Sequence, residues 1–114
     1  EGLDAVVVPR RQRASTVASA AIEEPERMQI VSAPPSYLDT LNIPVAHGRG
    51  LRADDPEGGI GREGTCVLDN ASVPRLFPDR DPADVVGETI TLRIDRLERS
   101  MRVVGVLSDP LRYR

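Results

Sequence analysis

Residues 88–107 read ETITLRIDRLERSMRVVGVL, and this segment is expected to be central to the fold. Apolar and polar residues alternate from 88 to 94 and again from 100 to 107, a period of two that is typical of strands with one buried face. Polar residues separate the two runs, so the stretch predicts an antiparallel hairpin. The first strand is predicted to carry Ile90, Leu92 and Ile94 on one face. In the returning strand, Met101, Val103 and Leu107 are predicted on one side, and Arg102, Val104 and Val106 on the other.

A buried strand and a capped helix are predicted just upstream of this hairpin. The apolar run at 65–68 indicates a short strand, and Asn70 is the predicted N-cap of a helix from 71 to 76. Pro74 falls in the first turn of that helix, where a missing N–H costs little. Phe77 is expected to face the core, and the proline after it is expected to end the helix.

The first half of the chain mixes strand and helix signals. The β-branched run at 4–9 and the alternating run at 28–31 each predict a strand. Residues 15–22 fit either a helix or an extended segment. Ser36 is the predicted N-cap of a short helix that continues to Leu41. Since strands and short helices are mixed without a regular βαβ alternation, the predicted class is α+β, with a small mixed or antiparallel sheet and short helices.

Composition excludes several classes of function. Hydrophobic residues make up 39% of the chain, which suits a packed core, yet no apolar run is long enough for a transmembrane helix. All fifteen basic residues are arginine and the net charge is −3, so the chain is a poor match for nucleic acid. A single cysteine excludes an intrachain disulfide. Because the chain begins at Glu1 without Met, we expect a piece of a larger protein, whose membrane segments would lie outside it.

Candidate reactive groups are few. His47 and nearby aspartates could bind a metal, but a catalytic zinc site usually takes three protein ligands, and a histidine hydrogen-bonded within its own turn is favoured. Cys66 is expected to be a small core residue. The glycine-rich stretch at 58–61 lacks the Gly-Lys-Ser/Thr ending of a phosphate loop. We therefore predict no catalytic residue, no metal and no cofactor. The aspartates considered with His47 are Asp54, Asp55 and Asp69.

A series of motifs occurs in an order that is typical of one family. Residues 31–44 read VSAPPSYLDTLNIP and are similar to a Val-Ser-Pro-x-Tyr-Phe-x-x-Leu-Gly-Ile segment, and residues 47–55 are similar to Gly-Arg-x-Phe-x-x-x-Asp. The chain thereby resembles the MacB-like periplasmic core domain of ABC transporter permeases over residues 28–109. It departs from the family at Leu38 and Leu51, where Phe is common, at Asn42, where Gly is common, and at Pro74. The later matching landmarks are Val67-Leu-Asp-Asn-Ala71, Leu76-Phe-Pro78, Asp84-Val-Val-Gly87 and Val103-Val-Gly-Val106.

This resemblance implies part of a two-lobed extracytoplasmic domain, periplasmic or outer-face, of a cell-membrane permease. In such transporters a separate ABC ATPase hydrolyses ATP on the other side of the membrane, and the outer domain transmits conformational change without catalysis during export. The implied partners are that ATPase and the transmembrane helices of the same transporter, with a periplasmic adaptor or a lipoprotein as a further partner. Residues 1–30 would belong in part to the membrane-proximal lobe, 31–109 would form the variable lobe, and 110–114 a tail.

The predicted partner surfaces are the loops at 48–64 and 78–84, and the first is preferred for its length and its mixture of charges. Four glycines and few apolar residues at 51–64 predict an exposed, mobile loop there, with a second polar loop at 79–84. Two other hypotheses stay open: a small metal-dependent hydrolase that uses His47 with one of the two adjacent aspartates, and a free-standing protein-binding domain unrelated to transport. The residues chosen for the surface, for their mixture of charges, are Arg49, Arg52, Asp54 and Asp55.

Overall fold

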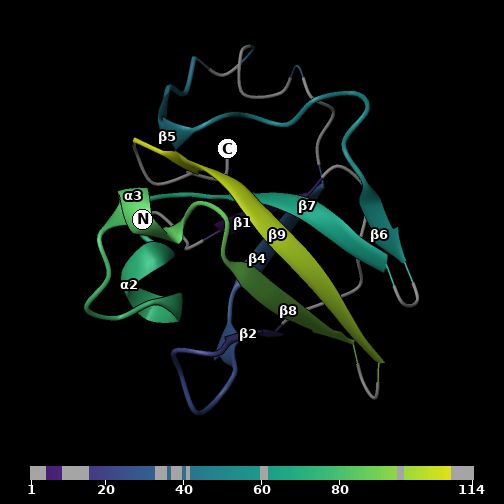
Figure 1. The fold of residues 1–114 in the computed structure, drawn as a ribbon, viewed down its shortest axis with the longest axis vertical. Helices are drawn as coiled ribbons and strands as arrows, with labels where there is room; N and C mark the ends of the chain where they lie inside the picture. Colours follow the sequence, from purple (N-terminus) through teal and green to yellow (C-terminus); the bar gives the residue numbers. More distant parts are fainter. Residues whose placement is uncertain are drawn as a thin grey trace.

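The computed structural model describes residues 5–8, 16–32, 36, 40, 42–59, 62–94 and 97–108 of the chain. These residues form one nine-stranded sheet and two helices of four residues each (Figure 1). The helices are α2 (Val73–Leu76) and α3 (Pro82–Val85). The strands are β1 (Ala5–Val8), β2 (Thr16–Ser19), β3 (Glu26–Arg27), β4 (Gln29–Ser32), β5 (Val45–Gly48), β6 (Glu57–Gly59), β7 (Arg62–Leu68), β8 (Thr89–Ile94) and β9 (Leu97–Leu107).

Strand β9 is the central element of the sheet. Its first half pairs with β8, its last residues pair with β5, and β7 pairs with β9 from Met101 to Val106. The order across the sheet is β3-β2-β8-β9-β7-β1-β4, and β6 pairs with the start of β7. The β7–β9 and β1–β4 pairs are parallel, and the other pairs are antiparallel. Any displacement of β9 therefore acts on three neighbouring strands at once.

The predicted α+β class is wrong, because the described part of the chain is mostly a curled, half-barrel β-sheet. The segment that fitted either a helix or a strand forms β2, where Val17 pairs with Leu92 of β8. Part of the predicted loop at 51–64 forms β6, which pairs with the start of β7. Both strands owe their conformation to pairing with neighbours, and local propensity does not reveal such partners.

The predicted hairpin is confirmed as β8 and β9, which pair from Thr89–Arg102 to Ile94–Leu97. Its apolar alternation faces the core, since Ile90 and Leu92 of β8 are fully buried. The predicted strands at 4–9, 28–31 and 65–68 are found as β1, β4 and β7 with shifted ends. These segments carry the strongest period-two or β-branched signals, which explains why the sequence locates them.

A β-bulge in β9 overturns the predicted faces near its end. Cys66 of β7 pairs with Val103, but the next residue of β7, Val67, pairs with Gly105. The extra residue in β9 reverses the alternation beyond it. Val106 therefore packs in the same core cluster as Val103, while Leu107 packs in the other cluster, the opposite of the predicted arrangement.

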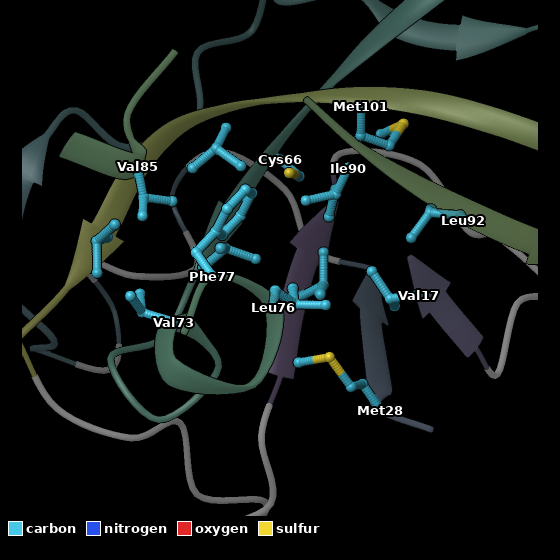
Figure 2. Close-up of a cluster of buried hydrophobic side chains, with 14 of the residues drawn as sticks. Val17, Met28, Cys66, Val73, Leu76, Phe77, Val85, Ile90, Leu92 and Met101 are labelled. Carbon is cyan, nitrogen blue, oxygen red and sulfur yellow. The ribbon is translucent and has the colours of Figure 1, made fainter. Parts of the chain in front are cut away.

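The main core lies against one face of the sheet and is closed by α2 (Figure 2). The prediction that Phe77 faces the core is confirmed, because its side chain is 2% exposed. Pro74 lies in the first turn of α2, as predicted, and the amide of Phe77 donates to the carbonyl of Val73 at 2.7 Å. Leu76 and Phe77 thus project from one short turn onto the buried side chains of β7, β8 and β9.

The predicted cap of this helix is wrong. Helix α2 begins after Ser72, whose amide and hydroxyl both donate to Asp69 Oδ1, at 3.0 and 2.5 Å. The Asn70 side chain instead donates from Nδ2 to the carbonyl of Ser108, at 2.7 Å. Asn70 therefore ties the chain after β7 to the end of β9, a long-range contact that a capping pattern does not indicate.

Two further predictions on helices and loops have different outcomes. The loop predicted at 79–84 contains most of α3, and Val85 of that helix is buried in the main core. The helix predicted from Ser36 to Leu41 lies mostly outside the described residues. Directly after it, Asn42 has a φ of 56°, in the left-handed region that glycine favours and asparagine tolerates. This explains how Asn42 can occupy a position where the family commonly has glycine.

A second, smaller core lies on the other face of the sheet. Val7 and Val67 point to this face because their neighbours along β1 and β7 belong to the main core. Leu51, which was predicted in an exposed loop, is buried here at 8% exposure. The second core also contains Leu107, with the half-buried side chains of Val31, Ile43, Val45 and Val104 packed against it.

Candidate partner surface

Residues 45–55, called the strap here, run from β5 across the end of β9. Strand β5 begins the strap by pairing antiparallel with β9, from Val45–Leu107 to Gly48–Gly105. One residue further on, the amide of Arg49 donates to the carbonyl of Val104 at 2.9 Å. Leu51 then inserts its side chain into the second core. The first half of the strap is therefore fixed by backbone pairing and by one apolar anchor.

Two glycines allow the strap to cross β9 at close range. A Cβ atom on Gly105 would lie 2.0 Å from the carbonyl oxygen of Arg49, and one on Gly48 would lie 2.2 Å from that of Val104. Gly48 also has a φ of 71°, which a residue with a side chain rarely adopts. The crossing thus requires glycine in both segments.

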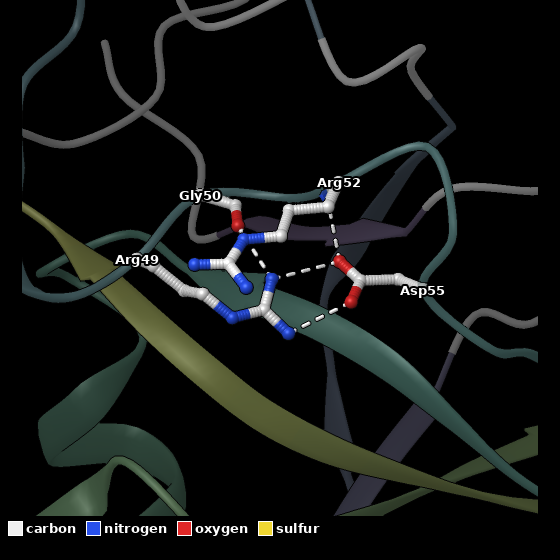
Figure 3. Close-up of polar contacts among 4 residues, drawn as sticks. All are labelled: Arg49, Gly50, Arg52 and Asp55. Carbon is white, nitrogen blue, oxygen red and sulfur yellow. Dashed lines mark hydrogen bonds and ion pairs between the residues drawn. The ribbon is translucent and has the colours of Figure 1, made fainter.

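An ion pair closes the second half of the strap (Figure 3). Arg49 donates from Nη2 to Asp55 Oδ1 at 2.7 Å and from Nη1 to Asp55 Oδ2 at 2.9 Å. Asp55 Oδ2 also accepts the backbone amide of Arg52 at 2.6 Å. Such bidentate, charge-assisted hydrogen bonds are among the stronger polar contacts in proteins. Asp55 thus holds a compact turn together. Its own backbone amide also donates to the carbonyl of Arg52, at 3.1 Å.

Burial and charge separate the four predicted surface residues into two pairs. The Asp55 side chain is 5% exposed and that of Arg49 is 33% exposed. Hydrogen bonding to Arg49 lowers the pKa of Asp55, and the same bond raises the pKa of Arg49. Arg52 and Asp54, by contrast, are exposed. Arg49 and Asp55 hold the loop in shape, and Arg52 and Asp54 are the two members of the set that are exposed to solvent.

The other candidate reactive groups have ordinary structural surroundings. His47 lies in β5 opposite Val106. Asp55 already accepts hydrogen bonds from both terminal nitrogens of Arg49. Within the described ranges, no group of three or more His, Cys, Asp or Glu side chains is placed to hold a metal ion. Cys66 is fully buried, and this burial raises the pKa of its thiol. A metal at His47 and Asp55 would first have to break the ion pair.

Sequence reasoning missed two features that position this surface. The first is the contact between Gly48 and Gly105, for which a glycine inside an otherwise regular strand was the available signal. The second is the attachment of Ser108, whose amide and hydroxyl both donate to the carbonyl of Pro44, at 3.0 and 3.2 Å. Nothing in the local pattern indicates this second contact, because its partners are far apart in the sequence.

Comparison with known proteins gave one match. The family model described as the MacB-like periplasmic core domain matches residues 2–113 of the chain. Neither the curated proteins nor the solved structures gave a match. In the part of the chain that the structure describes, no helix has the length and apolar character needed to span a bilayer. The family match covers both segments that meet at the crossing of the strap and β9.

Proposed function

The chain belongs to the MacB-like periplasmic core domain family, and from this premise we propose that it acts without catalysis, transmitting conformational change and engaging a partner or substrate during export. The family is one of periplasmic domains of ABC transporter permeases. The cognate ABC ATPase and the transmembrane helices of the same transporter are the proposed partners inside the complex. A periplasmic adaptor or a lipoprotein is the proposed partner outside the membrane.

The arrangement of the first and last described strands supports this role. Val6 of β1 pairs with Leu68 of β7, and Leu68 pairs with Val106 of β9. The start of β1 and the end of β9 therefore lie at the same end of the sheet, on either side of β7 and about 10 Å apart for two strand spacings. A domain whose first strand starts and whose last strand finishes at the same end of the sheet can be joined to membrane helices there and can present its remaining surface to partners.

The observation that carries the proposed surface is the shape of the strap. The ion pair of Arg49 with Asp55 presents the exposed side chains of Arg52 and Asp54 on a fixed turn. A surface that is already ordered loses little conformational entropy when a partner binds. The division of the chain at residue 30 into parts of two lobes stays a prediction; β4 runs across that position.

The test is export by the full-length permease with both exposed residues replaced, as Arg52→Ser together with Asp54→Ser. We expect export or complementation to fall while the amount of protein in the membrane stays the same. The matched control is Arg93→Ser with Glu98→Ser, which removes an exposed ion pair of the β8–β9 hairpin (3.1 Å) and should leave export intact. Full export by the strap variant would exclude this loop from the function.

A further inference from the structure

We infer that the strap and β9 are joined by a single lock, made of the Gly48–Gly105 crossing and the Arg49–Asp55 pair, so that the surface carrying Arg52 moves with β9. This inference deepens the proposed function: it says how a displacement at one end of the domain reaches the proposed partner surface. The lock itself consists of contacts within the chain and does not depend on any partner.

The crossing prevents the two backbones from sliding past each other. The positions of the absent Cβ atoms lie only 2.0 Å and 2.2 Å from carbonyl oxygens of the opposite segment, so both backbones are in direct contact. The bulge in β9 falls at this point, where the register with β7 shifts between Val67 and its predecessor. A lateral shift of β9 at Gly105 therefore has to displace the peptide of Arg49 as well.

Hydrogen bonds carry this contact into the turn of the strap. Val104 accepts the amide of Arg49, and the guanidinium of Arg49 then reaches six residues along the chain to Asp55. Asp55 in turn accepts the amide of Arg52. The backbone of Arg52 is thus connected to the backbone of β9 through the hydrogen-bonded side chains of Arg49 and Asp55.

The end of β9 is attached to the beginning of the strap as well. Ser108 follows β9 directly and donates twice to the carbonyl of Pro44, the residue before β5. Asn70 donates to the carbonyl of the same Ser108. The strap is therefore joined to β9 along β5 and at Arg49, and the residue directly before the strap, Pro44, is joined to Ser108, which favours movement of the strap and β9 as one body.

The decisive experiment measures amide hydrogen exchange of the 114-residue chain by NMR, comparing the parent with Asp55→Asn. The informative amide is that of Arg49, because it donates to Val104 and makes no contact with the altered carboxylate. If the lock acts as a unit, this amide exchanges about tenfold faster or more in the variant. The amide of Cys66, in the ladder between β7 and β9, serves as the reference for global unfolding and should stay unchanged.

A second variant tests the steric contact at Gly105. Gly105→Ala should speed exchange at Arg52, whose amide donates to Asp55 and not to β9. Gly87→Ala is the control for steric contact, because no atom lies within 4 Å of its new Cβ; its φ of 97° adds a backbone strain that Gly105→Ala lacks, so only an effect of Gly105→Ala at Arg52 that exceeds the effect of Gly87→Ala supports the lock. The double variant Gly105→Ala with Asp55→Asn should speed exchange by less than the product of the single effects, as expected for coupled sites.

Three results would overturn the lock: unchanged exchange at Arg49 in Asp55→Asn, an equal effect of Gly87→Ala at Arg52, or single effects that simply multiply. If Gly105→Ala unfolds the chain, the response of Arg49 to Asp55→Asn still decides the matter. Failure of the proposed function would look different. In that case the exchange data would show the lock, while export by the Arg52→Ser, Asp54→Ser permease would be normal.

Discussion

Asp55 is a nearly buried carboxylate whose role follows from its contacts. Its two oxygens accept three hydrogen bonds, two from Arg49 and one from the amide of Arg52. The bond from Arg49 is the main cause that lowers the pKa of Asp55, while burial opposes it. Asp55 was predicted to belong to a partner surface because of its charge. In the structure, its carboxylate is paired with Arg49 within the same loop.

The lowered pKa of Asp55 predicts a pH-dependent contribution to stability. An aspartate has a pKa of about 3.9 in an unfolded chain, so the stabilisation is fully present above that value and is lost as the pH falls through the lower folded pKa. Asp55→Asn should cost on the order of 1–3 kcal/mol near neutral pH, as for hydrogen bonds to a charged group.

Urea unfolding of the parent and Asp55→Asn over a pH series measures this difference, which should shrink towards the acid end. Asp54→Asn is the control, because Asp54 is exposed and its replacement should change stability little. A difference between the parent and Asp55→Asn that is constant from neutral to acid pH would contradict the role of the carboxylate.

Cys66 offers a second prediction at the scale of single residues. Its side chain is fully buried in the main core, and burial raises the pKa of its thiol, so the reactive thiolate is disfavoured. The folded chain should resist a disulfide reagent such as Ellman's reagent, and one thiol should react promptly in urea. Prompt, complete reaction of the folded chain would show that β7 is not buried as described.

At the scale of elements, the hairpin was predictable and its irregularity was not. Period-two alternation locates β8 and β9, because strands with one buried face impose that pattern. The bulge lies near Gly105, at the point where the strap, far away in the sequence, approaches β9. A rule that assumes unbroken alternation therefore places Val106 and Leu107 on the wrong faces.

The inward face of the hairpin predicts the effect of buried charges. Val103→Asp should cost several kcal/mol, because it buries a carboxylate in an apolar core without a partner. Leu92→Asp should destabilise the fold less. Arg99 is the cross-strand neighbour of Leu92, and the Arg99 Nε atom, which is buried without a hydrogen-bond partner, could donate to the new carboxylate. The control is Thr91→Asp, on the other face of β8, and thermal melts compare the three. A Val103→Asp variant as stable as this control would exclude the described face.

At the scale of the whole molecule, the sequence predicted the family better than the architecture. The ordered motifs identified the MacB-like domain, and the family match over residues 2–113 confirms it. The α+β class failed, because β2 and β6 form only through pairing with β8 and β7. The candidate site was chosen by charge, and spacing along a loop cannot show that Arg49 and Asp55 would pair. Sequence motifs therefore identify the family, while the contacts between residues such as Arg49 and Asp55 depend on how the sheet folds.

As a member of the MacB-like periplasmic core domain family, this chain is expected to lie on the outer face of the membrane as part of an ABC transporter permease. Its buried Cys66 gives a low background for labelling, and the exposed Asp54 is a suitable position for a new thiol. The most direct measurement labels the full-length Asp54→Cys permease with a membrane-impermeant maleimide in spheroplasts, with the unsubstituted permease as control. We expect the variant to be labelled in intact spheroplasts, because residue 54 then faces the medium. Labelling that appears only after the membrane is permeabilised would contradict this placement.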